Sequence, residues 1–203
     1  MSPAAQPAGN YYDKYRTANP IARRLMRGFL DAFDALVEQV PVSNALEIGC
    51  GEGELSIRLA QRGFRVRGCD ISADIVEEAR RRARAAQVDA AFWRQSIESI
   101  DVGAEAAPLV VCCEVLEHVD DPVRAVDVLA DLARPYLVAS VPREPVWRML
   151  NMARGKYLGA LGNTPGHVNH WGRNAFLQLM ARRFDVLQVR SPLPWTMVLC
   201  RRR

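Results

Sequence analysis

The stretch Ala45-Leu46-Glu47-Ile48-Gly49-Cys50-Gly51-Glu52-Gly53 decides the fold of this chain. Its first four residues, which are apolar except for Glu47, are typical of a buried strand, and the glycines that follow permit a tight turn with positive φ. Backbone N–H groups exposed at such a turn, where a helix begins, can hold a carboxylate or another anion. The segment therefore predicts a ligand-binding turn between the first strand of an α/β domain and a helix over residues 55–62.

The spacing of the glycines separates this turn from a dinucleotide-binding turn. A pyrophosphate-binding turn reads Gly-x-Gly-x-x-Gly, whereas here the third glycine comes one residue earlier and position 54 is Glu. Glu47, just inside the strand, adds a negative charge that repels a pyrophosphate and favours a cationic ligand. A nicotinamide or flavin enzyme is therefore the less favoured interpretation.

A second carboxylate follows the next strand. Residues 64–69 predict a short strand that ends at Asp70, and Ser72 is a suitable N-cap for the helix after it. A carboxylate in this place can accept hydrogen bonds from both hydroxyls of a ribose. Asp70 could instead be a simple turn residue, but its order after the glycine turn favours one shared nucleoside site.

The rest of the chain alternates between helix-like and strand-like patterns, which is typical of an α/β domain with a mostly parallel sheet. Further helices are expected from Asn19-Pro20 to Pro41, after Ser72, from Asp121-Pro122 and over 172–183. Further strands are expected at 90–94, 109–113, 137–141, 186–189 and 195–200. The short link between the last two strands favours antiparallel pairing.

Two segments stand outside this alternation, and we interpret residues 1–203 as a single domain around them. Residues 1–10 are small and polar, which predicts a disordered tail and argues against a signal peptide, hence for a cytoplasmic protein. Residues 142–171 fit no regular element and follow the fifth strand at the ligand-binding edge. Their apolar residues, with Trp147 among them, predict either a lid over an apolar or aromatic substrate or packing against the sheet.

Composition narrows the class of protein. With 203 residues, of which 49% are hydrophobic and 25% charged, the chain is an ordinary globular domain. No apolar run approaches the roughly 20 residues that span a bilayer, so we expect no membrane span. The cysteines Cys50, Cys69, Cys112, Cys113 and Cys200 are odd in number and form no Cys-x-x-Cys pair, which predicts buried, reduced thiols.

Arginine clusters at residues 80–84 and 201–203 accompany a formal charge of +4. Such clusters can bind nucleic acid. The first cluster, however, ends a predicted helix that begins with Asp74, Glu77 and Glu78, an arrangement that complements the helix dipole. We therefore expect a small-molecule substrate and no nucleic-acid partner.

On these residues the sequence resembles the class I S-adenosylmethionine-dependent methyltransferases, over roughly residues 11–200. The resemblance lies in residues 46–53, in Cys69-Asp70-Ile71-Ser72 and in Glu114-Val115-Leu116-Glu117-His118-Val119. The last motif is similar to the fourth-strand signature of the branch that includes the ubiquinone-type O-methyltransferases. The family implies a Rossmann-like, doubly wound sheet of seven strands, mostly parallel with a final antiparallel strand, and S-adenosylmethionine as the cofactor.

The resemblance also implies residue roles. Glu47, Gly49, Cys50 and Gly51 would surround the methionine part of the cofactor, Asp70 would hold the ribose, and Glu114 would begin the floor of the site near the sulfonium. Ile71, Ser96 and Ile97 would border the adenine, although many relatives carry Asp where this chain has Ser96. Tyr12 and Tyr15 belong to a segment that folds over the cofactor in similar enzymes, and they could equally pack against the first helix.

The histidines are the candidate general bases for transfer to a hydroxyl, because the unperturbed pKa of an imidazole lies near neutrality. The chain has His118 after the fourth strand, and His167 and His170 at the end of the 142–171 insertion. Each could instead bond only to loop backbone. Glu114, Glu117 and His118 also offer ligand types that suit a divalent metal, but Glu117 equally suits a solvent-facing position, and we predict a site without a metal.

Together these features predict a methyltransferase that acts at an oxygen atom of a small apolar or aromatic acceptor. A nucleic-acid methylase is an alternative, but base-modifying enzymes often carry Asn or Asp followed by Pro-Pro and an aromatic residue where this chain has Glu114-Val115-Leu116-Glu117. A non-catalytic cofactor-binding subunit is another alternative, against which the three histidines weigh.

Overall fold

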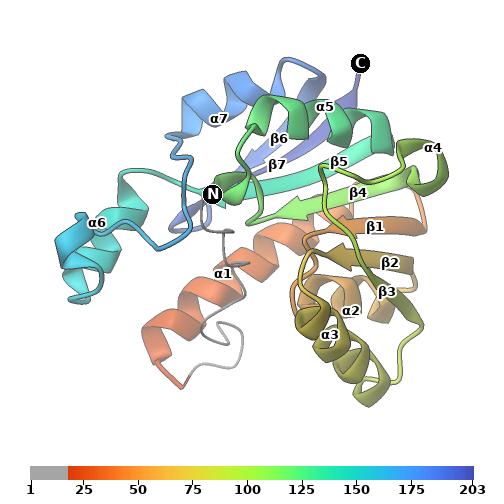
Figure 1. Ribbon diagram of the computed structural model, residues 1–203, viewed down its shortest axis with the longest axis horizontal. Coiled ribbons are helices and arrows are strands. Elements are labelled where there is room, and N and C mark those ends of the chain that lie inside the picture. The colour runs from red at the N-terminus through yellow and green to blue at the C-terminus, as the bar shows by residue number, and fades with distance from the viewer. Residues whose placement is uncertain (1–17) are drawn as a thin grey trace, which may run out of the picture.

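Each strand-like apolar run of the sequence forms a strand of one sheet in the computed structural model, which describes residues 18–203 (Figure 1). The strands are β1 (Asn44–Ile48), β2 (Arg65–Asp70), β3 (Ala90–Arg94), β4 (Ala107–Cys113), β5 (Ala133–Pro142), β6 (Phe184–Arg190) and β7 (Trp195–Arg202). Their order is β3-β2-β1-β4-β5-β7-β6; β7 pairs antiparallel with both β5 and β6, and the other neighbouring pairs are parallel. The predicted seven-stranded sheet with one reversed final strand is confirmed.

Helices cover both faces of the sheet (Figure 1). On one face lie α1 (Pro20–Val37), α2 (Glu54–Gln61) and α3 (Ala73–Ala85), and on the other lie α4 (Val102–Glu105), α5 (Pro122–Leu132) and α7 (Arg173–Met180). Neighbouring residues of a central strand therefore enter different cores: Val110 joins the core under α5 and α7, while Leu109 and Val111 join the core under α1 and α2. Burial on both faces explains why the central strands read as continuous apolar runs.

Local capping sets where three of the helices begin, as the sequence predicts. The Asn19 side chain accepts a hydrogen bond from the backbone N–H of Ile21 at 2.9 Å, with Pro20 in the first turn of α1. Ser72 and Asp121 cap α3 and α5 in the same way. Each cap satisfies N–H groups that have no partner inside the helix.

The structure corrects the prediction that residues 142–171 lack regular elements. The segment contains α6 (Val146–Ala153) and the 3-10 helix η2 (Leu158–Ala160), and it projects from the body of the protein (Figure 1). A helix of eight residues has little stability of its own, and here α6 is held by tertiary bonds. The buried Asn151 side chain donates to the Gly162 carbonyl oxygen at 2.9 Å. Two other short elements, α4 and η1 (Leu116–His118), are also absent from the sequence-based prediction.

Charged and sulfur-containing side chains behave as the sequence predicts. In the first arginine cluster Arg80 pairs with Glu77, and Arg82 pairs with Glu78 at 2.7 Å, so the guanidinium groups are engaged within the protein. All five cysteines are buried free thiols. Among the described residues, no helix is long and apolar enough to cross a membrane.

Candidate active site

The predicted cofactor residues meet at one edge of the sheet. Because β1, β2 and β4 are parallel neighbours, with β1 in the middle, their carboxyl ends point the same way. The glycine turn follows β1, Asp70 ends β2 and Glu114 follows β4. This edge is where open α/β sheets bind their ligands.

Asp70 ties the glycine turn to the end of β2. Its Oδ2 accepts the Gly51 N–H at 3.0 Å, and its Oδ1 accepts the Ser72 N–H at 3.0 Å. An ionised carboxylate has about four acceptor sites, so each oxygen can accept one more hydrogen bond. The carboxylate is thus oriented by the backbone while it keeps capacity for a pair of ribose hydroxyls.

The turn comes so close to the end of β4 that only glycine fits at its first position. Gly49, Gly51 and Gly53 all have positive φ, at 68°, 53° and 81°. A Cβ on Gly49 would overlap Cγ2 of Val115. Val115 is therefore a wall of the site, and sequence analysis missed this role because strand order alone brings the two segments together.

A second anchor of the turn is an ion pair that the sequence analysis also missed. Glu52 pairs with Arg82 of α3 at 2.9 Å, with 11% and 13% of the respective side chains exposed. Arg82 also bonds Glu78 one turn earlier on the helix. The turn is consequently fastened to β2 through Asp70 and to α3 through Glu52.

The structure corrects the prediction that the Glu47 side chain carries a negative charge. Its side chain is 3% exposed and accepts a hydrogen bond from the Ser56 hydroxyl of α2 at 2.5 Å. Burial raises the pKa of the Glu47 carboxyl to about 8, and this effect outweighs the hydrogen bond from Ser56, which lowers the pKa. At neutral pH the carboxyl therefore holds its proton, and it braces β1 against α2.

This raised pKa predicts a distinct pH dependence of stability. Between the ordinary pKa of 4.5 and about 8, the unfolded chain has lost the Glu47 proton and the folded chain has kept it. Stability contributed by the neutral carboxyl is therefore complete below pH 4.5 and is lost by about pH 8, at about 1.4 kcal/mol for each pH unit. Glu47→Gln keeps an acceptor for Ser56 and does not titrate. Its free energy of unfolding should therefore rise relative to that of the wild type as the pH increases from 4.5 to about 8.

Chemical denaturation of both proteins from pH 5 to 9 measures this difference. The exposed Glu98→Gln is the matched control and should follow the wild type. A difference between Glu47→Gln and wild type that stays constant with pH would show that Glu47 is ionised in the folded protein.

The three residues expected around the adenine have different exposures. Ile71, just after β2, is 53% exposed and offers an open apolar surface to a ring. Ile97 is 6% exposed and belongs to the core. The Ser96 hydroxyl accepts the Glu98 N–H at 3.2 Å and so shapes the turn after β3. Of the three, Ile71 is the one whose side chain is exposed.

Glu114 has a strained backbone at the centre of the edge. Its φ is +62°, a conformation that costs a non-glycine residue roughly 1–2 kcal/mol. The strained conformation is stabilised by hydrogen bonds, because the Glu114 N–H donates to the Ser140 carbonyl at 3.1 Å and its Oε2 accepts the Trp195 Nε1–H at 2.6 Å. Such strain is typical of functional positions. Trp195 enters the site through the pairing of β7 with β5, which no local sequence signal indicated.

Two of the three candidate bases form a pair beyond Glu114. The rings of His118, in η1, and His167 contact edge to face, with centroids 4.9 Å apart. Nδ1 of His118 lies 2.9 Å from the Gly166 carbonyl oxygen. A carbonyl can only accept, so this contact requires a proton on Nδ1, and in the neutral ring the lone pair is then on Nε2.

Aromatic rings continue from this pair toward the core. Trp147 of α6 stacks on His167 at 5.8 Å between centroids and meets Trp195 at 5.8 Å. Trp195 in turn contacts Phe29 of α1 at 5.0 Å. The imidazole pair therefore stands against an aromatic wall that α6 and β7 build together.

The structure groups Glu117 with the two histidines rather than with Glu114. The ligand atoms of Glu117, His118 and His167 lie within 4.8 Å of one another. Glu117 is 1% exposed, which corrects the prediction that it could face solvent. Imidazole and carboxylate ligands suit a divalent cation such as Zn²⁺ or Mn²⁺. Glu114 bonds Trp195 instead.

The remaining predicted residues lie apart from this grouping. His170 is exposed, and its Nε2 contacts Oδ1 of Asn163 at 2.7 Å. Cys50 is 5% exposed, and burial raises the pKa of its thiol well above the ordinary range, so it is present as an apolar thiol. Tyr12 and Tyr15 lie outside the described residues.

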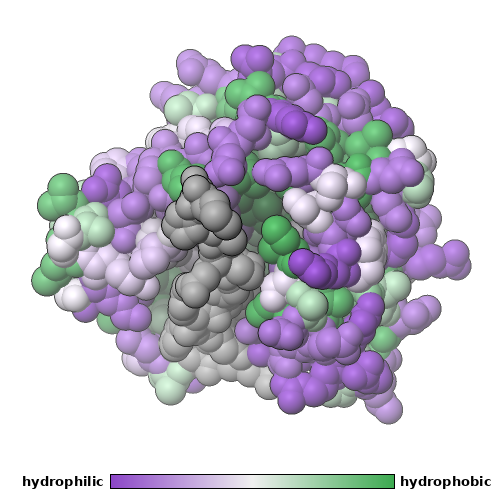
Figure 2. All heavy atoms as spheres, in the orientation of Figure 1, coloured by the Kyte–Doolittle hydropathy of each residue, from purple (hydrophilic) through white to green (hydrophobic). Residues whose placement is uncertain are grey.

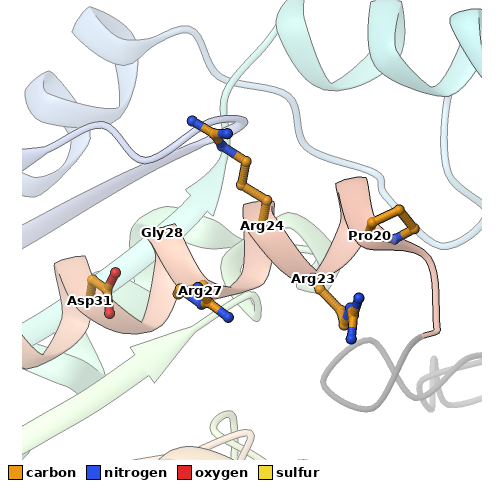
Figure 3. Close-up of a pocket in the computed structure, with 6 residues that line it drawn as sticks. All are labelled: Pro20, Arg23, Arg24, Arg27, Gly28 and Asp31. Atoms are coloured by element: carbon orange, nitrogen blue, oxygen red, sulfur yellow. The ribbon is translucent and has the colours of Figure 1, made fainter.

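A surface hollow of about 510 Å³ runs along α1 and is lined by Pro20, Arg23, Arg24, Arg27, Gly28 and Asp31. None of the predicted site residues lines it. Figure 3 shows Arg23 and Arg24 extending to different sides of the helix, so the guanidinium groups do not converge on one point. The surface in Figure 2 is mostly hydrophilic; apolar side chains lie on the projecting α6 lobe, which carries the exposed Met149, Leu158 and Leu161, and also near the middle and at the right of the view.

Comparison with known proteins agrees with this geometry. A family model described as a methyltransferase domain matches residues 45–136, which contain the glycine turn, Asp70 and Glu114. A ubiquinone biosynthesis O-methyltransferase of Hahella chejuensis is 32% identical over 171 residues, covering 76% of this chain and 69% of the relative. One from Coxiella burnetii is 29% identical and covers 68% of this chain and 64% of the relative. The chain thus spans about two thirds of the length of such relatives.

Solved structures show the same fold at lower identity. The magnesium protoporphyrin IX methyltransferase of Synechocystis, with bound S-adenosylhomocysteine, has a TM-score of 0.72 at 22% identity and covers 94% of this chain and 91% of that chain. An N-methyltransferase of Bradyrhizobium japonicum, in complex with S-adenosylhomocysteine, has a TM-score of 0.69 at 20% identity, with 96% and 93% of the chains covered. Strand order, glycine turn and sequence similarity agree, and this chain belongs to the class I S-adenosylmethionine-dependent methyltransferases.

Proposed function

We propose that this protein binds S-adenosylmethionine and methylates an oxygen atom of a small apolar or aromatic acceptor. The observation that carries the proposal is the position of the His118–His167 pair at the same sheet edge as the glycine turn, Asp70 and Glu114. His118 is in η1, immediately after Glu114 and Val115, so a base lies next to the end of β4. The sequence similarity to O-methyltransferases supports oxygen as the acceptor atom.

The residues of the edge fit the cofactor. Oriented Asp70 oxygens suit the ribose hydroxyls, exposed Ile71 suits the adenine, and the glycine turn lets a ligand approach the backbone. S-adenosylmethionine supplies a methyl group on a positively charged sulfur. Since Glu47 is neutral at pH 7, Asp70 and Glu114 are the edge carboxylates left to balance that charge.

The chain's contribution to the chemistry is to position the acceptor and to accept a proton. His118 would accept the hydroxyl proton of the acceptor at Nε2, and the cofactor would supply the methyl group and leave as a neutral thioether that keeps the electron pair of the broken C–S bond. The hydrogen bond to Gly166 keeps the imidazole in the required tautomer. Most of the rate enhancement then comes from holding the two reactants in line.

The acceptor would lie between the histidine pair and the α6 lobe. Trp147 stacks on His167, and its Nε1–H donates to the Thr164 hydroxyl at 2.9 Å, so its ring is held in place at the site. A flat aromatic wall suits an aromatic or apolar acceptor. In this proposal residues 142–171 are the lid, with Trp147 at its inner face.

Calorimetry with S-adenosylhomocysteine tests the cofactor part of the proposal. Asp70→Asn loses the charge and one acceptor oxygen, so we expect binding to weaken by roughly 10–100-fold, the equivalent of one charge-assisted hydrogen bond of about 1.5–3 kcal/mol. The exposed Asp74→Asn on α3 is the matched control and should bind like the wild type. No binding by folded wild-type protein, or preferential binding of NAD, would refute the proposal.

A further inference from the structure

The segment that carries His167 is fastened to η1 by backbone carbonyl groups. The Glu117 carbonyl oxygen accepts the N–H groups of Val168 and Asn169, at 2.9 and 3.1 Å. The Asn169 side-chain amide donates to the carbonyl oxygens of Leu116 and Val119, at 3.2 and 2.6 Å. Side chain and backbone of Asn169 together therefore meet three carbonyls across a separation of about 50 residues.

These carbonyls need donors from outside η1. A 3-10 helix of three residues closes few internal hydrogen bonds, and His118 N–H to Val115 oxygen, at 2.9 Å, is one that it makes. Leu116 is fully buried and Val119 is 8% exposed, so water has little access to this backbone. A buried carbonyl without a donor is costly.

Asparagine is the residue type that meets this geometry. Its planar NH₂ group carries two protons, and each is directed at one of the two carbonyls. Aspartate has the same shape but carries only acceptors, which would face two further acceptors. Alanine would leave both carbonyls without their side-chain donor.

The position of the histidine pair depends on this attachment. His118 lies within η1, while Gly166 and His167 directly precede Val168 and Asn169. The contact of His118 Nδ1 with the Gly166 carbonyl at 2.9 Å and the ring contact at 4.9 Å both join the two fastened segments. If the segments separate, the Nδ1 contact is lost, and with it the constraint on the tautomer.

We propose that Asn169 is a positioning residue that holds the His118–His167 pair in register and fixes the tautomer of His118. The consequence for catalysis rests on the proposed function, whereas the structural claim can be tested without an acceptor substrate. Asn169 touches the backbone of η1 and acts through the histidines.

Nitrogen-15 spectra of the histidine rings test the proposal in the full-length chain. Wild type should show His118 as the Nδ1–H tautomer with a contact to the His167 ring. In Asn169→Asp the His118 signal should move toward the Nε2–H form that dominates in solvent-exposed imidazoles, and the ring contact should be lost. We expect Tm to fall by roughly 4–10 °C, because two carbonyls lose their donors. The exposed Asn174→Asp on α7 adds the same charge and should change none of these signals.

Cofactor binding separates this proposal from the proposed function. Asn169→Asp should bind S-adenosylhomocysteine about as tightly as wild type, because Asn169 contacts neither the glycine turn nor Asp70. A wild type that shows the His118 signature but binds no cofactor would refute the proposed function and leave the Asn169 role intact. An Asn169→Asp protein with a lower Tm but with the His118 tautomer and the contact to the His167 ring unchanged would overturn the positioning role.

Discussion

Replacing His118 with asparagine is expected to lower kcat by about 10²–10⁴-fold, the range that a positioned general base contributes. The asparagine amide can take the place of Nδ1–H as the donor to the Gly166 carbonyl, so the junction between η1 and the 166–170 segment should persist. What disappears is the Nε2 lone pair that accepts the proton. Affinity for S-adenosylhomocysteine should stay close to that of wild type, because cofactor-binding residues are untouched.

A panel of phenolic acceptors is first screened with the wild type to find one that is methylated. The rate of S-adenosylhomocysteine release with that acceptor then measures the effect of the substitution. His170→Asn is the matched control, since His170 is exposed and bonded to Asn163 outside the pair. A loss of activity in His170→Asn with His118→Asn unaffected would assign the base to His170 instead of His118. Equal activity in all variants would mean that the acceptor needs no base.

Replacing Gly49 with alanine is expected to destabilise the protein by roughly 2–5 kcal/mol and to abolish measurable cofactor binding. About 1–2 kcal/mol follows from placing alanine at positive φ, and about 1–3 kcal/mol follows from overpacking. The new methyl group would overlap Val115 Cγ2. Valine is stiff at χ1, so the turn itself has to move, and with it the amides that face the ligand.

Gly63 supplies a matched control for the backbone contribution. It has φ +87° at the end of α2, and a Cβ there would meet nothing within 4 Å. Gly63→Ala should therefore lose only about 1–2 kcal/mol and bind the cofactor normally. Adding Val115→Ala to Gly49→Ala should recover about 0.5–3 kcal/mol as a coupling between neighbours. Denaturation midpoints that are equal for Gly49→Ala and Gly63→Ala would disprove the overlap.

Much of the fold could be predicted because its signals are local. Asn19-Pro20, Ser72 and Asp121-Pro122 cap their helices wherever those helices lie. Predicted strands end within a few residues of the observed ones, and 90–94 agrees at both ends. The errors concern short elements such as α6 and η1, which depend on hydrogen bonds from outside the element: Asn151 of α6 bonds Gly162, 11 residues away, and Asn169 bonds Val119, 50 residues away.

The residues of the site likewise include some that the local sequence predicts and others that only packing brings into it. Gly49 and Asp70 were recognisable because each directly follows a predicted strand and parallel strands bring their ends to one edge, whereas Glu114 was implied by the family resemblance. The protonation state of Glu47 could not be predicted from the sequence, because desolvation and the hydrogen bond from Ser56 arise only when α2 packs on β1. Trp195, Val115 and Arg82 likewise become part of the site through packing.

By itself the amino-acid sequence determined the alternation of strands and helices, the glycine turn and the carboxylate that ends β2, because periodicity, capping and backbone freedom act between near neighbours. Only the tertiary structure decided which histidines pair, which carboxyl keeps its proton and what stands opposite Gly49. Those properties depend on burial and on hydrogen bonds between segments tens of residues apart, which exist only once the sheet has assembled and η1 has met the 166–170 segment.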